Sequence, residues 1–164
     1  MRRKKIFPDY VRNIVFGAED SLVSTVGVLF GLASSNEYTL AQLMLVGVTL
    51  TSVEALSMGV GSYLSETEIH ELDHSGNHKD SPIIGGLLMY FSYLIFGIVV
   101  LAPYLLFGIP TGKFVSIILT FISLYFVGYF PTKSIREGLR MFIVAGIAII
   151  VGFTVTKIFE NVKF

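Results

Sequence analysis

Long apolar segments dominate this chain of 164 residues and constrain its fold more than any other feature. A helix needs about 20 mostly apolar residues to cross a bilayer, because lipid offers the backbone no hydrogen-bond partners. Segments that approach or exceed this length run over residues 14–33, 40–64, 83–107, 114–130 and 139–158. The sequence therefore predicts an all-α polytopic membrane protein with five transmembrane helices in a single domain, residues 1–164.

The breaks between these segments carry residues that favour turns. Ser34-Ser35-Asn36 follows the first segment, Gly108-Ile109-Pro110-Thr111-Gly112 follows the third, and Pro131-Thr132-Lys133-Ser134 follows the fourth. The break after the second segment is longer and polar, and we expect residues 66–82 to form a short His/Glu-rich loop between helices two and three.

Composition supports a membrane location and excludes several classes of function. Charged residues make up only 15% of the chain, against about 25% in typical soluble proteins, and mean hydropathy is +0.73. Twelve basic and twelve acidic residues cancel, so no nucleic-acid partner is indicated. The chain has no cysteine, phosphate-binding loop or activated-nucleophile motif. We therefore expect neither an enzyme nor a nucleotide-driven pump, and transport energy would have to come from an ion gradient.

The distribution of lysine and arginine predicts the orientation in the membrane, because short cytosolic loops are enriched in both. With the N-terminus in the cytosol, the inside carries Arg2, Arg3, Lys4, Lys5, Arg12, Lys79, Lys133, Arg136 and Arg140. The outside carries only Lys113, Lys157 and Lys163. We expect a cytosolic N-terminus and an external C-terminus. The chain shows no organelle-type leader, which favours a prokaryotic plasma membrane.

Carboxylates within two of the apolar segments are the strongest functional signal, because an acid in a membrane span usually faces a bundle interior or a watery cavity. In the first segment a stripe of small and polar residues recurs at helical spacing: Asn13, Gly17, Asp20, Ser24, Gly27 and Gly31. The second segment has a matching stripe: Gly47, Thr51, Glu54, Met58, Gly61 and Ser65. Such stripes let helices approach closely and turn their polar groups toward one another.

The depth of these residues predicts a metal site. Asp20 lies eight residues past Arg12, and Met58 lies eight residues before Glu66, so both lie about 12 Å from the cytosolic ends. Glu54 lies one turn deeper. A carboxylate oxygen beside a thioether sulfur suits a divalent transition metal better than Mg²⁺ or Ca²⁺. The alternative is that Met58 only packs against its neighbours. Glu19 points elsewhere, either as a solvated charge near the headgroups or as a further ligand.

The polar stretch after the second segment gives a second signal. It contains Glu66, Glu68, His70, Glu71, Asp73, His74, His78 and Asp80. A helix continuing past the membrane would align Glu66, His70 and His74, which are four residues apart. Imidazoles and carboxylates bind iron, manganese and zinc. We take Glu66, Glu68, His70 and His74 as candidate ligands that capture metal; a merely solvated stretch is the alternative.

Two motifs resemble the vacuolar iron transporter family. The run Phe16-Gly17-Ala18-Glu19-Asp20-Ser21-Leu22-Val23-Ser24-Thr25 resembles its first helix, and Ala55-Leu56-Ser57-Met58-Gly59-Val60-Gly61-Ser62-Tyr63-Leu64-Ser65 resembles its second. The resemblance implies a five-helix homodimer with a metal path between the subunits, which exports cytosolic Fe²⁺ and often Mn²⁺ in exchange for protons. It also implies that Asp20 and Met58 occupy the positions of the family's transport-site carboxylate and methionine.

Three departures distinguish this chain from the family pattern. Ser21 stands where a glycine usually follows the aspartate, and Leu50 stands where some members carry a second-helix carboxylate. Glu54 lies one turn closer to the methionine instead. Residues 66–82 replace the large glutamate-rich cytosolic domain of many members, so this is expected to be a short member without that domain.

The function predicted from these observations is a metal/proton antiporter with Fe²⁺, and Mn²⁺ as a further candidate, as its substrate rather than a cofactor. Metal would collect at the polar stretch and move to Asp20, Glu54 and Met58. Protons and metal cations would compete for the same carboxylates. The alternative is a metal-binding or sensing protein, or a passive cation channel, without proton coupling.

Overall fold

The computed structural model describes residues 8–35, 37–72 and 80–160, and these are almost entirely helical. The helices are α1 (Pro8–Ala33), α2 (Leu40–Leu72), α3 (Pro82–Thr132) and α4 (Ile135–Glu160). All four are long and apolar enough to cross a membrane. The all-α fold predicted from the sequence is therefore confirmed, with four helical elements in the described residues where the sequence suggested five.

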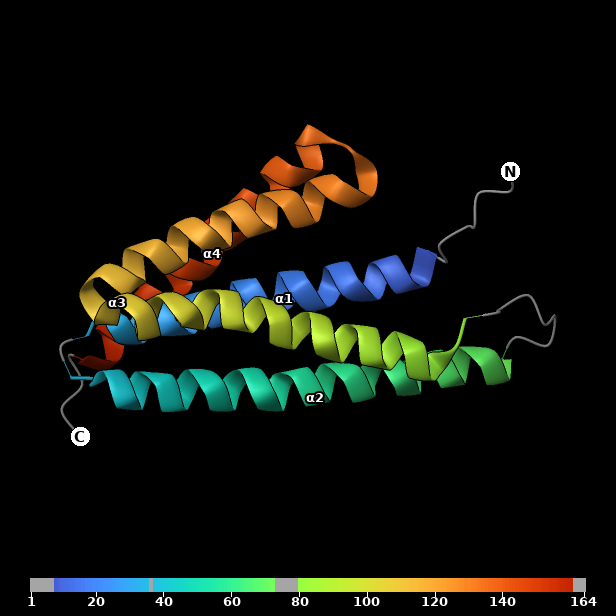
Figure 1. Ribbon diagram of the computed structural model, residues 1–164, viewed down its shortest axis with the longest axis horizontal. Coiled ribbons are helices and arrows are strands. Elements are labelled where there is room, and N and C mark those ends of the chain that lie inside the picture. The colour runs from blue at the N-terminus through green and yellow to red at the C-terminus, as the bar shows by residue number, and fades with distance from the viewer. Residues whose placement is uncertain (1–7, 36, 73–79, 161–164) are drawn as a thin grey trace.

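The difference arises in α3, which doubles back on itself (Figure 1). Its backbone leaves helical geometry inside the element only at Gly108, where φ is 70° and ψ is −178°. A positive φ of this kind suits glycine, which has no Cβ to clash. Ser116 Oγ donates a hydrogen bond of 2.8 Å to the Val100 carbonyl oxygen. In a straight helix these residues would be about 24 Å apart, so the two arms of α3, residues 82–107 and 109–132, lie against each other next to the reversal and diverge beyond it.

The chain reverses inside the break predicted at residues 108–112, but the reversal needs one non-helical residue rather than a loop of five. Pro110 does not interrupt the second arm, since it lies in the first turn of that arm. There a proline's missing N–H has no helical partner to lose, and its fixed φ already matches the helix.

The helix that begins at Leu40 continues past the predicted membrane segment, residues 40–64, to Leu72. Residues 65–72 contain no glycine or proline to end the helix. The extension is held to α1, since the Glu66 carboxylate accepts hydrogen bonds from Arg12 and Asn13. Residues 66–72 of the expected loop thus belong to a helix, and residues 73–79 lie outside the described part of the chain.

The central helix α1 packs against the other three helices. The hydrophobic core includes Leu22, Val26 and Leu29 of α1 with Val100 and Tyr104 of α3, all fully buried. Near the end of α1 its backbone meets that of α4, where a Cβ added to Gly152 would overlap the carbonyl oxygen of Gly27. Close backbone approach at small residues is typical of helix contacts in membranes.

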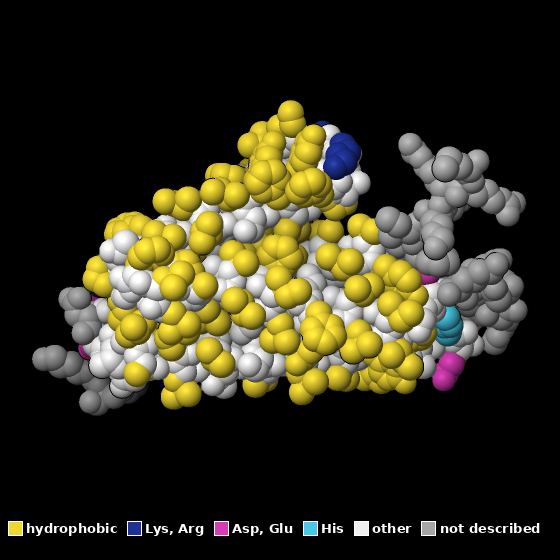
Figure 2. All heavy atoms as spheres, in the orientation of Figure 1, with side chains coloured by type: hydrophobic (Ala, Val, Ile, Leu, Met, Phe, Trp, Pro, Cys, Tyr) yellow, Lys and Arg dark blue, Asp and Glu magenta, His cyan; other side chains and the backbone are white. Residues whose placement is uncertain are grey.

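The outer faces of α2 and α4 are apolar and exposed. The buried residues of α2 between 43 and 59 recur every four positions, as Leu43, Gly47, Thr51, Ala55 and Gly59. Only Gly138 and Ala145 of α4 are buried. Figure 2 shows hydrophobic side chains along the body of the molecule, with charged and histidine side chains gathered toward its ends. Such a surface fits a lipid environment.

Candidate metal-binding site

Two hydrogen bonds fix how α1 and α2 face each other. Asn13 Nδ2 donates to Glu66 Oε1 at 3.0 Å, and Ser24 Oγ donates to Glu54 Oε2 at 3.2 Å. The helices are antiparallel, and the two pairs are separated by 11 residues on α1 and 12 on α2 (24 − 13 and 66 − 54). Counting from either pair places Asp20 level with Met58 or its neighbour. The stripes on α1 and α2 therefore face each other, as their spacing predicts.

Glu54 is the anchored carboxylate of this region. Its Oε2 accepts hydrogen bonds from Ser24 Oγ and from the hydroxyl of Tyr93, and these two hydroxyl groups are 2.8 Å apart. Tyr93 lies on the first arm of α3 and is fully buried. A third helix thus orients the acid. Sequence reasoning missed Tyr93, although a tyrosine inside an apolar span needs a polar partner for its hydroxyl group, and this was the available signal.

Asp20 differs from Glu54 because it makes no hydrogen bond or ion pair with another described residue. Its side chain is half-buried. Its oxygens are therefore available for a cation, whereas Glu54 already accepts hydrogen bonds from Ser24 and Tyr93.

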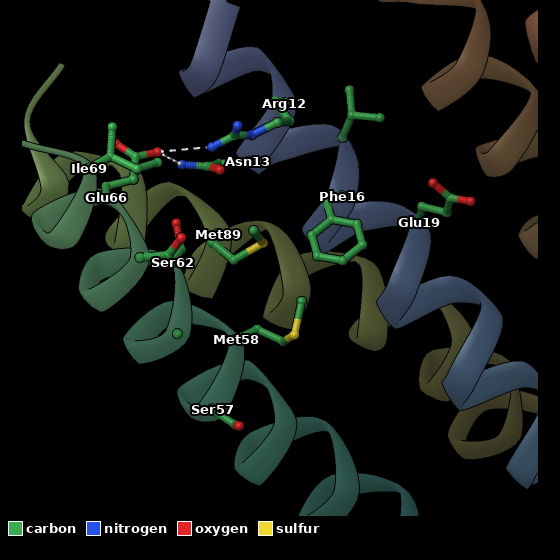
Figure 3. Close-up of a pocket in the computed structure, with 13 residues that line it drawn as sticks. Arg12, Asn13, Phe16, Glu19, Ser57, Met58, Ser62, Glu66, Ile69 and Met89 are labelled. Carbon is green, nitrogen blue, oxygen red and sulfur yellow. Dashed lines mark hydrogen bonds and ion pairs between the residues drawn. The ribbon is translucent and has the colours of Figure 1, made fainter. Parts of the chain in front are cut away.

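A cavity of about 780 Å³ lies between α1 and α2. Its lining comprises Arg12, Asn13, Val15, Phe16, Glu19, Ser57, Met58, Gly61, Ser62, Ser65, Glu66, Ile69 and Met89. Figure 3 shows the thioether side chains of Met58 and Met89 directed into the same space, while the Glu19 carboxylate points away from both. Met89 was not predicted, because a single methionine in an apolar helix usually signals only packing.

At the other end of the cavity Glu66 is held in place. It is 5% exposed, and its Oε1 lies 3.3 Å from Arg12 Nη2 and 3.0 Å from Asn13 Nδ2. Because the helix continues to Leu72, Glu68 is two residues from both Glu66 and His70 and projects from a different face. His70 is half-buried, and His74 lies outside the described residues.

Within the part of the chain that the structure describes, no three histidine or acidic side chains come close enough together to hold a metal ion. Of the predicted ligands, Met58 and Glu66 line the cavity, whereas Asp20 and Glu54 are not part of its lining and lie further along the contact between α1 and α2. The α1–α2 contact therefore offers separate oxygen and sulfur donors rather than a closed site.

Arg12→Ala tests the structural role of the cavity's end. It leaves the buried Glu66 carboxylate with Asn13 as its remaining partner, and we expect a loss of about 2 kcal/mol in unfolding free energy. The apparent Tm in detergent, followed by circular dichroism, should fall by roughly 5 °C.

The matched control is Arg140→Ala. Arg140 pairs with Glu137 at 3.6 Å, and these side chains are 74% and 36% exposed. An exposed pair contributes less than about 1 kcal/mol, so this Tm should barely move. Equal losses in the two variants would contradict the special role of Arg12.

A sequence model of the VIT family matches residues 11–75 and 66–157, which is most of the chain. A search of curated proteins returns no match.

Proposed function

This chain belongs to the VIT family of membrane metal-ion transporters, and we propose that it exports Fe²⁺, with Mn²⁺ as a second substrate, from the cytosol in exchange for protons. The observation that supports the proposal is that the polar stripes of α1 and α2, two otherwise apolar helices, face each other. Glu54 is anchored by Ser24 and Tyr93 on one side of this interface. Asp20 faces it with available oxygens, and Met58 supplies a sulfur.

The proposed topology has five membrane crossings. A straight helix of the 51 residues of α3 would be about 76 Å long, far more than the roughly 30 Å of hydrocarbon. Its reversal at Gly108 instead gives two arms, each long enough to cross once. With the N-terminus in the cytosol, Lys133, Arg136 and Arg140 lie on the cytosolic side, in agreement with the positive-inside rule. The membrane we propose is a prokaryotic plasma membrane.

We further propose a homodimer in which a second copy completes the metal path. The cavity is open along α2, where Gly61 is exposed and a Cβ added to it would meet nothing within 4 Å. Two-fold symmetry would bring a second Asp20, Glu54 and Met58 to the same axis. The described residues of one chain bring too few ligands together to hold a metal ion, and the second copy would supply the missing oxygen and sulfur atoms.

In the proposed mechanism, Glu66 and the half-buried His70 receive metal at the cytosolic end, together with Glu68 and His74. The ion then moves to Asp20, Glu54 and Met58. A buried carboxylate is stable when it binds either a proton or a metal ion, so arrival of one favours release of the other. The thioether sulfur favours transition metals over Mg²⁺ and Ca²⁺. Rocking of the helices at their glycine contacts would open the path alternately to each side.

Reconstituted liposomes test the proposal. Vesicles containing the protein and a pH-sensitive dye are given Fe²⁺, Mn²⁺, Zn²⁺ or Co²⁺, with and without an imposed pH gradient. We expect Fe²⁺ and Mn²⁺ to drive proton movement in the opposite direction, and the gradient to drive metal uphill. A metal flux that is the same with and without the pH gradient would identify a passive channel. Metal binding without flux would identify a sensor, and either result would overturn antiport.

A further inference from the structure

A second hollow lies on the other side of α1, away from the metal path. It has a volume of about 680 Å³, within the range of small-molecule sites. We call it the apolar groove, and its lining is Val11, Ile14, Val15, Ala18, Phe96, Ile122, Ser123, Phe126, Val127, Phe130 and Pro131. All but Ser123 are apolar. The groove therefore suits hydrocarbon and offers very little to a polar ligand.

The groove follows from how the helices diverge. The second arm of α3 and the start of α4 stand apart from the α1–α2 end of the molecule (Figure 1). One wall is a single face of α1, with residues 11, 14, 15 and 18 at helical spacing, and the opposite wall is the second arm. The lining of the hollow reaches Phe130 and Pro131, next to the turn between α3 and α4.

Two cations lie at this turn. Lys133 caps α3, and its Nζ lies 4.7 Å from the ring centroid of Phe130, which itself lines the groove. Arg136 is exposed in the first turn of α4. Neither cation forms an ion pair with any acid in the described residues. Figure 2 shows Lys and Arg side chains, in dark blue, at the tip formed by the turn between α3 and α4.

From this juxtaposition we propose that the apolar groove binds an anionic phospholipid, with one acyl chain between α1 and the second arm of α3 and its phosphate at Lys133 and Arg136. Charge complementarity identifies the occupant. A zwitterionic lipid would fill the groove but carries its own ammonium group and no net negative charge to balance the two cations, and a free phosphate ion would leave the groove without hydrocarbon. Basic residues beside a groove between membrane helices suit an anionic headgroup. The inference rests on the proposed topology, which places this end at the cytosolic leaflet.

The chain contains no tryptophan, so one introduced tryptophan reports on its own surroundings. Ile122→Trp places it in the groove, where the side chain is 47% exposed, and Ile147→Trp places the control on the outer face of α4, at 57% exposure. Each variant is reconstituted in mixtures of brominated phosphatidylglycerol or brominated phosphatidylcholine with unlabelled lipid. Bromine quenches tryptophan fluorescence on contact, so quenching measures which lipid occupies each place.

We expect the tryptophan of Ile122→Trp to select phosphatidylglycerol, by roughly fivefold for each of the two cations. The control on α4 should show little preference. Adding Lys133→Gln and Arg136→Gln to Ile122→Trp should abolish the selectivity, while soluble glycerol phosphate should not displace the lipid. Folding is checked by gel filtration, and Phe126→Trp replaces Ile122→Trp if that variant does not fold.

Equal quenching by the two lipids in the groove would overturn the proposal. So would selectivity that survives loss of both cations. Quenching by neither lipid would mean that another surface, such as a second copy of the chain, covers the groove, which also overturns it. The measurement uses no metal and no pH gradient, so its failure and a failure of metal transport are separate results.

Discussion

Replacing both Asp20 and Met58 by alanine is expected to lower metal-driven proton flux by roughly a hundredfold. The two residues lie at the same level on facing helices, and the change removes a carboxylate with available oxygens together with the sulfur donor. Loss of groups that merely orient metal ligands already costs about 10–100-fold in affinity or activity. Removing two proposed ligands should cost at least as much. The initial rate of proton movement in liposomes, at saturating Fe²⁺, measures the effect.

The single variants and one remote variant make this result specific. Asp20→Asn keeps the shape of the side chain but loses its charge, and should account for most of the loss. Met44→Ala removes a half-buried methionine from the same helix α2, where it packs against the core away from the cavity. This variant should transport normally once its lower stability is allowed for. Wild-type flux from the double variant would eliminate the proposed site.

Gly152→Ala is expected to produce the largest loss of stability among single methyl additions. The new Cβ would overlap the carbonyl oxygen of Gly27, so α1 and α4 would have to separate. Backbone cannot rotate aside as a flexible side chain can, and we place the cost near the upper end for overpacking, about 3 kcal/mol. The apparent Tm of the detergent-solubilised protein should fall by roughly 6–12 °C.

Gly146→Ala, on the same helix, is expected not to lower the stability of the protein. A Cβ there meets nothing within 4 Å. Alanine is the better helix former by about 0.5–1 kcal/mol, so this variant should be unchanged or slightly more stable. If both variants lost similar stability, helix propensity or detergent effects would explain the result better than the contact of α1 with α4.

The parts of the fold that could be predicted depend on local sequence. Apolar length identifies each membrane-crossing stretch, and spacing identifies the faces on which Asp20 and Glu54 lie, because both patterns are contained in one helix. The reversal at Gly108 could not be located so closely. The five residues from Gly108 to Gly112 suggest a loop, whereas only the first needs unusual dihedral angles and the rest begin the next arm.

Partners between helices were the other information that the sequence lacked. Tyr93 reaches Glu54 from 39 positions away, and Glu66 meets Arg12 from 54 positions away. The sequence predicted Glu66 to be a metal ligand in a loop. Its buried hydrogen bonds to α1 give it a structural role as well. Distant pairs of this kind depend on packing, which no local pattern encodes.

The one-residue reversal at Gly108 also bears on biosynthesis. A longer loop would expose more backbone N–H and C=O groups, and these groups would lose their bound water as the loop crossed the hydrocarbon. Here a single residue, Gly108, leaves helical geometry, and Lys113 is the nearest charge in the sequence. In the proposed topology the two arms would insert together as one hairpin, with no longer loop of exposed amides to desolvate.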